Sequence, residues 1–382
     1  MTDAGPLPDP GAFDLPAGVA YLNCAYMGPL PRVALAAGRH ALEGKARPWE
    51  IGVPDFFEPV ERARSLFAGF VGGDADGVCI VPSVSYGIAL AAANLPVGRG
   101  DRIVVLAEQF PSNVYAWRDL AERTGAEVVT VPRPADDGWT AAVEAAVDER
   151  CAVVAVPACH WTDGTAVDLV RVGDRARSAG AALVVDACQA AGAVPLDVGR
   201  IRPDFLVTAA YKWLLGPYSL AFCWVAPQWR EGRPLEHNWI TRAGSDDFAG
   251  LVDYTDERAP GARRYDMGEV SNFALIPVAI ASMEVLAGWG LDAVAAHAGT
   301  LTGAIADGAA ELGLAVAAPV ARSPHLLGAR LPEGLDAPAV ADHLRERQVH
   351  VSVRGTSLRV SAHVFNTPDD VDRLLAALKE GL

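Results

Sequence analysis

Residues 204–225 read DFLVTAAYKWLLGPYSLAFCWV, a long apolar stretch with one lysine, Lys212, near its centre. The chain of 382 residues contains only two other lysines, Lys45 and Lys379, and both stand in more polar, helix-like surroundings. Apolar neighbours keep water from an amine and disfavour its ammonium form, which suits an amine that attacks a carbonyl carbon and holds it as a Schiff base. A strand-end lysine whose ammonium reaches back to water explains this stretch equally well.

A second apolar stretch upstream favours the catalytic interpretation. Residues 182–189 read ALVVDACQ, which predicts a buried strand that ends on Asp186, with Gln189 three residues later. Open α/β sheets bind ligands at the carboxyl ends of their parallel strands. An ionised aspartate at such a place can pair with the protonated ring nitrogen of pyridoxal phosphate. Capping of the next helix is the common alternative for a strand-end aspartate.

The two stretches together resemble a known family. The strings VVDACQ and VTAAYKWLLG are similar to the aminotransferase class V family of fold-type-I pyridoxal phosphate enzymes, which includes cysteine desulfurases, kynureninase and isopenicillin N epimerase. The resemblance runs from about Tyr21 to the C-terminus, and it is closest to the epimerase-like members in the strings LNCAYMGPLP, EQFPSNVYAW, HWTDGT and RRYDMGE. It implies an α/β fold-type-I transferase, with a large domain whose mostly parallel sheet lies between helices and a small C-terminal α+β domain.

Composition argues against several classes of function. The formal net charge of −15 disfavours nucleic acid and anionic membrane surfaces as partners, because both require basic patches. No apolar run approaches the ~18–20 residues of a membrane helix, and the acidic N-terminus lacks the features of a signal peptide. The six cysteines form no C-x-x-C pair and no zinc spacing, so we expect no metal site, buried free thiols and a cytoplasmic location.

Alternating strand and helix patterns with short loops predict a mostly parallel sheet with helices on both faces. We expect an N-terminal arm over residues 1–20, a large cofactor-binding domain over 21–275, and a linker helix with a small C-terminal domain over 276–382. Residues 227–272 lack periodicity but contain aromatic residues, which indicates a long functional loop rather than disorder.

The end of that loop leads us to expect a partner subunit. In the resembling family, the segment that matches RRYDMGEVSN crosses a dimer interface and helps to close the partner's site. The resemblance therefore implies a homodimer, with Asn272 among the cofactor-binding residues. Glu269 stands where the family more often has threonine, so the usual threonine contact with the phosphate is in doubt.

A candidate phosphate site precedes the helix predicted over residues 86–95. The residues between it and the strand predicted over 78–81 are Pro82, Ser83, Val84 and Ser85. A strand, a turn and a helix start with small hydroxyl residues present free N–H groups to an anion, although a serine N-cap is the ordinary alternative. No G-x-G-x-x-G motif or P-loop occurs. The resemblance implies phosphate contacts from the Val84 backbone, Ser85 and the hydroxyl of Tyr211.

Further cofactor contacts also follow from the resemblance. Phe110 matches the position that stacks on the pyridine ring. Many desulfurases carry a histidine at this position, and a histidine can exchange protons whereas a phenylalanine cannot. Gln189 matches the residue that hydrogen-bonds the ring hydroxyl. In the loop HWTDGT the match falls near Trp161 and Thr162, and we take Thr162 as the contact. His160 could carry protons, but a structural strand-end histidine is the favoured interpretation.

Two arginines near the C-terminus are candidates for substrate binding. The strings VHVSVRG and SLRVSAHV predict two strands with apolar residues on one face and Arg354 and Arg359 on the other. A polar face in water explains that alternation as well. RVSAHVFNT, however, resembles the family segment whose arginine binds the substrate α-carboxylate as a fork, which implies this role for Arg359 and a supporting cation in Arg354. Asn23 and Tyr26, in a segment that runs over the family's active site, are further candidates, with a turn residue and a packing aromatic as the alternatives.

These assignments predict an enzyme that acts at the α carbon of an amino acid through a Schiff base on Lys212. Transamination is the default chemistry, while β-elimination, including C–S cleavage, and epimerisation stay open. A non-catalytic ligand-binding module is the alternative from another class. Cysteine desulfurases carry a persulfide-forming cysteine on a loop just before the matching arginine, and the short connection RGTSL contains none. This argues against persulfide-forming desulfurase chemistry.

Overall fold

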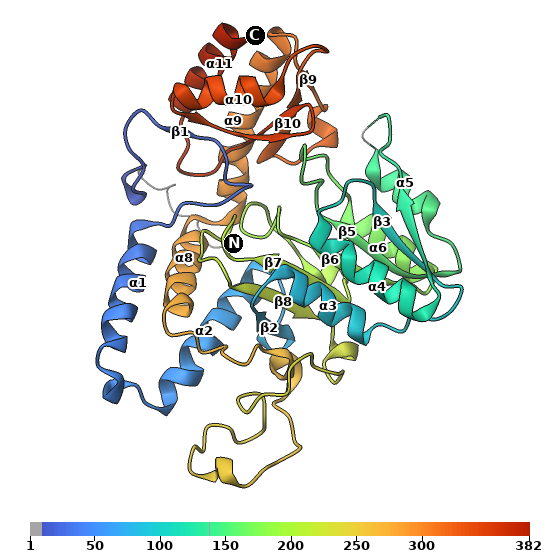
Figure 1. Cartoon of the computed structure of the whole chain (residues 1–382), viewed down its shortest axis with the longest axis vertical. Helices are drawn as coiled ribbons and strands as arrows, with labels where there is room; N and C mark the ends of the chain where they lie inside the picture. The colour runs from blue at the N-terminus through green and yellow to red at the C-terminus, as the bar shows by residue number, and fades with distance from the viewer. Residues whose placement is uncertain (1–9, 137) are drawn as a thin grey trace.

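The computed structural model describes residues 10–136 and 138–382, so residues 1–9 of the expected N-terminal arm lie outside the described residues. A seven-stranded sheet forms the centre of the larger part, in the order β2-β8-β7-β6-β5-β3-β4 (Figure 1). Only β8 runs antiparallel to its neighbours, so the predicted mostly parallel sheet is confirmed. The strands are β2 (Val78–Val81), β3 (Arg102–Leu106), β4 (Glu127–Val131), β5 (Cys151–Pro157), β6 (Ala182–Asp186), β7 (Phe205–Ala209) and β8 (Ala221–Val225).

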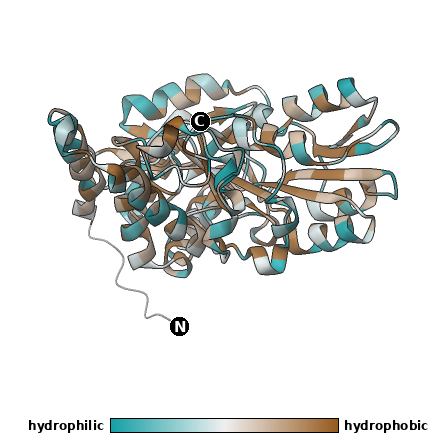
Figure 2. Cartoon of the chain, turned by 90° about the horizontal axis from the view of Figure 1, so that it is seen from below, coloured by the Kyte–Doolittle hydropathy of each residue, from teal (hydrophilic) through white to brown (hydrophobic). Residues whose placement is uncertain are grey.

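Helices cover both faces of this sheet, as the sequence predicted. Alternate strand residues point to opposite faces, so Val184 packs in one apolar core and Val185 in the other. One face carries α3 (Val84–Asn94) and α4 (Tyr115–Thr124). The other face carries α2 (Val53–Val71), α5 (Trp139–Ala146), α6 (Leu169–Ser178), α7 (Val198–Ile201) and α8 (Leu275–Trp289), and α1 (Arg32–Lys45) packs on α8. Hydrophobic residues accordingly concentrate on the strands at the centre of Figure 2.

The smaller part has its own antiparallel sheet, in the order β12-β13-β10-β9, and its own apolar core. Its strands are β9 (Ala315–Val316), β10 (Leu326–Arg330), β12 (Ser352–Arg354) and β13 (Ser357–Ser361), and its helices are α9 (Leu291–Glu311), α10 (Ala337–Glu346) and α11 (Pro368–Gly381). In addition, β1 (Ala20–Tyr21) pairs in parallel with β11 (Val349–His350).

The start of the chain packs differently from the expected division at residue 21. Ala20 and Leu22 are buried in the core of the smaller part, because β1 pairs with β11 there. A two-residue strand leaves almost no periodic signal in a sequence, so this pairing was not predicted. It places the segment that carries Asn23 beside β13, since Asn23 forms a β-bridge with Ser361.

The connection between the two parts is α8 followed directly by α9. They meet at Gly290, whose φ of 78° suits glycine, and their axes differ by 78°. Within the described ranges, no single helix combines the length and apolarity needed to span a membrane, and α8 and α9 do so only as this bent pair.

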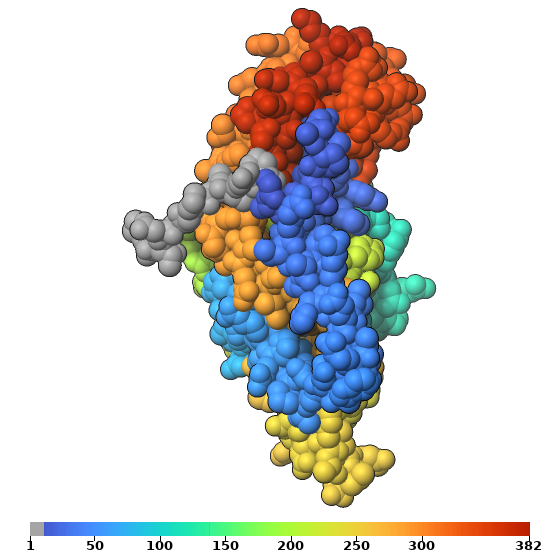
Figure 3. Space-filling model, turned by 90° about the vertical axis from the view of Figure 1, so that its left-hand side faces the viewer, coloured from blue at the N-terminus to red at the C-terminus, as the bar shows by residue number. Residues whose placement is uncertain are grey.

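Between β8 and α8, residues 226–274 contain the 3₁₀ turns η5 (Pro227–Trp229), η6 (Gly250–Val252) and η7 (Gly261–Tyr265), and an isolated β-bridge joins Arg242 to Arg258. This agrees with the long irregular loop that the sequence predicted. Figure 3 shows its middle, in yellow, projecting at the opposite end of the molecule from the small domain, in red. Phe56 of α2 contacts Trp239 and Phe248 at the base of this projection, with ring centroids 6.0 and 5.1 Å apart. The other 3₁₀ turns are η1 (Pro10–Ala12), η2 (Pro48–Glu50), η3 (Ala75–Gly77), η4 (Pro111–Asn113) and η8 (Pro319–Ala321).

Candidate active site

A cavity of about 290 Å³ lies at the carboxyl ends of β5, β6 and β7, next to the N-terminus of α3. This is where ligands bind in open parallel sheets. Residues far apart in the sequence meet there, and most of the predicted cofactor-binding residues are among them. Those that line the cavity are Val84, Ser85, Phe110, Asp186, Gln189, Tyr211 and Lys212.

Lys212 follows β7 by three residues and is only 7% exposed. The turn that carries it is tightly held: Gly28 N–H donates to the carbonyl of Tyr211 at 2.9 Å, and a Cβ at position 28 would overlap the carbonyl oxygen of Lys212. The Lys212 Nζ atom lies 5.4 Å from the centre of the Phe110 ring. In the part of the chain that the structure describes, no carboxylate forms an ion pair with it. The amine is therefore buried, fixed in place and free for a ligand.

Asp186, the last residue of β6, is 5% exposed and accepts a hydrogen bond from the Cys188 N–H at 3.0 Å. Gln189 is oriented by its neighbours: its Nε2 donates to the carbonyl of Ala25 at 3.1 Å, and its Oε1 accepts from Trp213 Nε1 at 2.8 Å. An amide nitrogen carries two N–H groups, so one remains for a ligand. The cavity thus presents an ionisable acid and a positioned amide donor.

The first turn of α3 supplies the anion-binding part of the cavity. Ser83 is the N-cap, because its Oγ accepts from Tyr86 N–H at 3.2 Å, and it also lies 2.9 Å from Ser85 Oγ. The sequence did not distinguish the capping serine from the one expected to bind phosphate. The helix N-terminus leaves N–H groups and a positive dipole end directed at the cavity. An anion such as a phosphate fits there.

Tyr211 is half-buried in the same cavity, and its ring lies 4.6 Å from that of Tyr218. Burial, and to a smaller extent nearby Cys188, raises the pKa of the Tyr211 phenol to about 12. The hydroxyl therefore keeps its proton at neutral pH. It can donate a hydrogen bond, as the expected contact with a phosphate requires.

Trp161, rather than the expected Thr162, lines the cavity. Thr162 Oγ1 instead contacts His160 Nδ1 at 2.7 Å and Arg133 at 3.1 Å. His160 is fully buried, stacks on Trp139, and has its Nε2 3.0 Å from the carbonyl of Ala107. Burial lowers its pKa, which agrees with a structural histidine. The expected cofactor contact of Thr162 is thus corrected, because this polar cluster already uses its hydroxyl.

Asn272, Asn23 and Tyr26 do not line the cavity. Asn272 Oδ1 accepts from the Leu275 N–H at the start of α8. Asn23 Oδ1 accepts from Ser352 Oγ at 2.7 Å, which ties it to the arginine-bearing hairpin. Tyr26 is 56% exposed.

Arg359 of β13 is 1% exposed and donates to the carbonyl of Trp161 at 3.0 Å, which places it beside the cavity. Its Nε has no hydrogen-bond partner, and no described carboxylate pairs with its guanidinium. Burial and then the charge of Arg354 lower the pKa of Arg359 to about 9. The group keeps its charge at neutral pH, so it lies in the protein as a cation without a counter-ion. An anionic ligand would supply one.

The six cysteines are buried and free, as predicted. The sequence did not indicate that Cys159 and Cys188 line the cavity, although Cys188 follows Asp186 by two residues. Burial raises the pKa of Cys159 to about 12 and that of Cys188 well above its ordinary value, so both thiols stay protonated. Within residues 10–136 and 138–382, no cluster of three or more His, Cys, Asp or Glu side chains could hold a metal ion.

Several known proteins are similar to this chain in sequence. The sequence model of the Aminotransferase class-V family matches residues 54–374. Isopenicillin N epimerase of Streptomyces clavuligerus is 28% identical over 381 residues, which cover 94% of this chain and 94% of that protein. An uncharacterized aminotransferase of Bacillus subtilis, YcbU, is 27% identical over 318 residues, 82% of this chain and 81% of that protein.

The fold also matches solved structures. The cystine C–S lyase C-DES, in complex with its reaction product cysteine persulfide, has a TM-score of 0.86 at 18% identity, covering 96% of this chain and 98% of that one. A variant of C-DES with glycine covalently linked to its pyridoxal phosphate cofactor has the same TM-score. At these identities the likeness shows a shared fold.

Proposed function

Because this chain belongs to the aminotransferase class-V family and its cofactor is pyridoxal phosphate, we propose that it is an aminotransferase in which Lys212 takes the proton from the α carbon of an amino acid. The observation that carries this proposal is the buried Lys212, which has no acidic partner among the described residues and shares one cavity with Asp186. Exchange of an amino group requires one proton carrier, and Lys212 can be that carrier.

The residues present fit the cofactor group by group. The N-terminus of α3 suits the phosphate, and Asp186, which has no cationic partner within the described ranges, suits a protonated ring nitrogen. The face of Phe110 suits an aromatic ring, and the free N–H of Gln189 suits a ring hydroxyl. A residue that suits each group of the cofactor therefore lines the one cavity.

When bound, pyridoxal phosphate supplies an aldehyde carbon that joins amines and a pyridinium ring that withdraws electrons from the substrate. Lys212 then serves as the base that takes the α proton and holds it for the next proton transfer. Phe110 cannot replace it, because a phenyl ring carries no exchangeable proton. Arg359 binds the carboxylate and so orients the α carbon toward Lys212, while Asp186 keeps a proton on the ring nitrogen.

Epimerisation is the second candidate, and the 28% identity to isopenicillin N epimerase over 94% of the chain favours it. Epimerisation requires a second proton donor on the face opposite Lys212. The hydroxyl of Tyr211, which keeps its proton at neutral pH, or that of Tyr218 is a candidate donor for that step, since both side chains line the cavity. The two reactions therefore differ in where the proton goes: epimerisation returns a proton to the α carbon from the opposite face, whereas transfer of the amino group leaves the α carbon without it.

An amino-acid panel tests these proposals. We expect the purified enzyme to convert an amino acid and a keto acid into the complementary pair, and Lys212→Ala to abolish the conversion. Loss of optical purity without keto acid would instead establish epimerisation. Pyruvate with sulfide or thiol would establish β-elimination. A protein that alters no amino acid would support a binding module.

We also propose that sulfur transfer through a hairpin persulfide is not its chemistry. The turn between β12 and β13 consists of Gly355 and Thr356 and offers no thiol, and the cavity thiols of Cys159 and Cys188 are buried and protonated. The same panel checks this point. A protein-bound persulfide after incubation with cysteine would contradict it.

A homodimer and a cytoplasmic location complete the proposal. Trp239 and Phe248 are each 38% exposed on the projecting loop, and Asn272 does not reach the cavity of its own copy, which supports a site completed by a second copy. The six free thiols support a reducing compartment. Sedimentation of the purified protein at twice the mass of one chain would support the dimer, and a monomer with full activity would contradict it.

A further inference from the structure

The hairpin of β12 and β13 presents a row of polar side chains on one face. In its antiparallel register Ser352 faces Arg359 and Arg354 faces Ser357. Directly opposed residues share a face, as do residues two apart on one strand. All four therefore lie on one side of the hairpin, while Leu358 packs on the other side in the core of the small domain.

Trp161 joins this face to the cavity. The guanidinium carbon of Arg354 lies 5.0 Å from the centre of the Trp161 ring, and that of Arg359 lies 6.0 Å from it. Trp161 lines the cavity itself. Two cations thus share one aromatic side chain at the edge of the space that holds Lys212.

Neither arginine has a counter-ion in the described part of the chain. The Nε atoms of both Arg354 and Arg359 lack hydrogen-bond partners, and the bond that Arg354 makes is to the carbonyl of the preceding residue, Val353, at 2.6 Å. Burial lowers the pKa of Arg354 as well, and the two cations repel each other. A single carboxylate has two oxygens and pairs fully with one guanidinium fork. The second fork then still lacks an acid.

We infer that the substrate is an α-amino acid with a second acidic group in its side chain, with Arg359 binding the α-carboxylate and Arg354 the distal acid. This rests on the proposed function, because it assigns a specificity-determining residue to the same site. The contrasting arrangement is one in which both arginines bind one carboxylate. The two arrangements differ in what a second acidic group adds to binding.

The two arrangements can be distinguished by the binding of unreactive acids to the yellow, cofactor-loaded protein. We expect glutarate to bind at least about 10-fold more tightly than butyrate by calorimetry, because it adds one charge-assisted pair. Arg354→Gln should remove that difference. Arg345→Gln, an exposed arginine of the same domain paired with Asp342, is the matched control and should keep it.

With reactive amino acids, the corresponding measurement is the ratio of kcat/KM for glutamate to kcat/KM for glutamine. We expect Arg354→Gln to lower this ratio by about 10-fold or more. Equal binding of glutarate and butyrate, or an Arg354→Gln variant that weakens both acids by one factor, would overturn the inference. A protein that never binds the cofactor would refute the proposed function instead, so the two failures are distinguishable.

Discussion

Two arginines of this chain are buried to the same extent, yet their surroundings are opposite. Arg64 and Arg359 are each 1% exposed. Arg64 pairs with Asp266 at 2.7 Å and with Glu61 at 3.0 Å, and it also donates to the carbonyl of Val78. Arg359 has no carboxylate within ion-pair distance among the described residues. Carboxylates of the protein neutralise Arg64, whereas Arg359 is left available to an anionic ligand.

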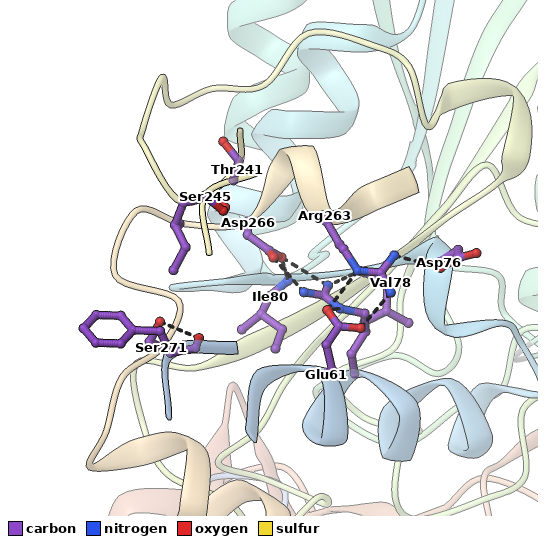
Figure 4. Close-up of polar contacts among 12 residues, drawn as sticks. Glu61, Asp76, Val78, Ile80, Thr241, Ser245, Arg263, Asp266 and Ser271 are labelled. Carbon is purple, nitrogen blue, oxygen red and sulfur yellow. Dashed lines mark hydrogen bonds and ion pairs between the residues drawn. The ribbon is translucent and has the colours of Figure 1, made fainter. Parts of the chain in front are cut away.

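The neutralised cation belongs to a structural cluster that Figure 4 shows. Asp266 also accepts from Ile80 N–H at 2.7 Å, and Arg263 bridges Glu61 and Asp76. These bonds fasten the end of the long loop to β2, the strand that leads into the turn before α3. Burial alone would lower the pKa of Arg64, but Asp266 and then Glu61 raise it above its ordinary value. The pKa of Arg359 moves the other way, because burial and the charge of Arg354 lower it and no described carboxylate opposes them.

The largest expected effect is on stability at the neutralised cation. Asp266→Asn keeps an acceptor for Ile80 N–H but leaves Arg64 as a buried charge without its nearest acid, which costs about 3–5 kcal/mol of unfolding free energy. Urea denaturation measures it. The control is Arg359→Met, which removes a buried cation that has no acidic partner among the described residues, so it should not lower the unfolding free energy. Equal losses in the two variants would break the comparison.

The next effect is on substrate binding at the free cation. Arg359→Gln should raise KM by about 100-fold, since truncating one partner of a buried charged pair costs about 2–5 kcal/mol. The cofactor absorbance and the urea midpoint should stay close to those of the unaltered protein. Loss of cofactor in parallel with substrate binding would show that Arg359 supports the whole cavity instead.

Two buried histidines sharpen the comparison, because they avoid an unpaired charge by staying neutral. His325, whose Nε2 lies 2.6 Å from the carbonyl of Gln189, and His363 both contact Trp213 next to Lys212. Burial lowers the pKa of His325 from 6.5 to about 4, and burial with the charge of His325 lowers that of His363 to about 3. The unfolded chain therefore takes up protons that the folded one cannot.

The contribution of these histidines to stability should consequently be constant above pH 6.5 and fall as the pH drops from 6.5 toward 4. The loss is about 2 kcal/mol for His325 between pH 6.5 and pH 5, measured by urea denaturation at each pH. His325→Gln should flatten this dependence, whereas His40→Gln, at an exposed position, should not. A slope that His325→Gln leaves unchanged would exclude this assignment.

The smallest effect is expected at the outer edge of the structural cluster. Asp76 is 70% exposed and pairs with Arg263, so Asp76→Asn should lower the unfolding free energy by less than about 1 kcal/mol. Such a small loss beside the large one at Asp266 would show that burial, rather than the number of ion pairs, sets the strength of this cluster. A loss as large as that of Asp266→Asn would contradict that view.

The sequence predicted the sheet and the cofactor side of the cavity because both depend on local patterns. ALVVDACQ and the stretch around Lys212 are apolar strands that end in polar residues, and strand ends meet at one edge of a parallel sheet. The long loop was equally visible from its lack of periodicity. Phe110, Asp186 and Lys212 thus came together as expected.

What the sequence did not predict depends on contacts between distant segments. Thr162 was chosen over Trp161 because nothing local shows that Arg133 and His160 bind its hydroxyl. The pairing of β1 with β11 joins residues more than 300 positions apart. Arg64 forms ion pairs with acidic side chains, whereas Arg359 forms none among the described residues. This difference is likewise a property of the folded chain.

The most direct test of this account uses the scarcity of lysine. The yellow protein is treated with borohydride, digested and analysed by mass spectrometry, so that any amine joined to the cofactor keeps it. We expect the phosphopyridoxyl group on the peptide that contains Lys212 and none on those that contain Lys45 or Lys379. The group on either of those two lysines, or on no lysine of a protein that binds the cofactor, would contradict the account.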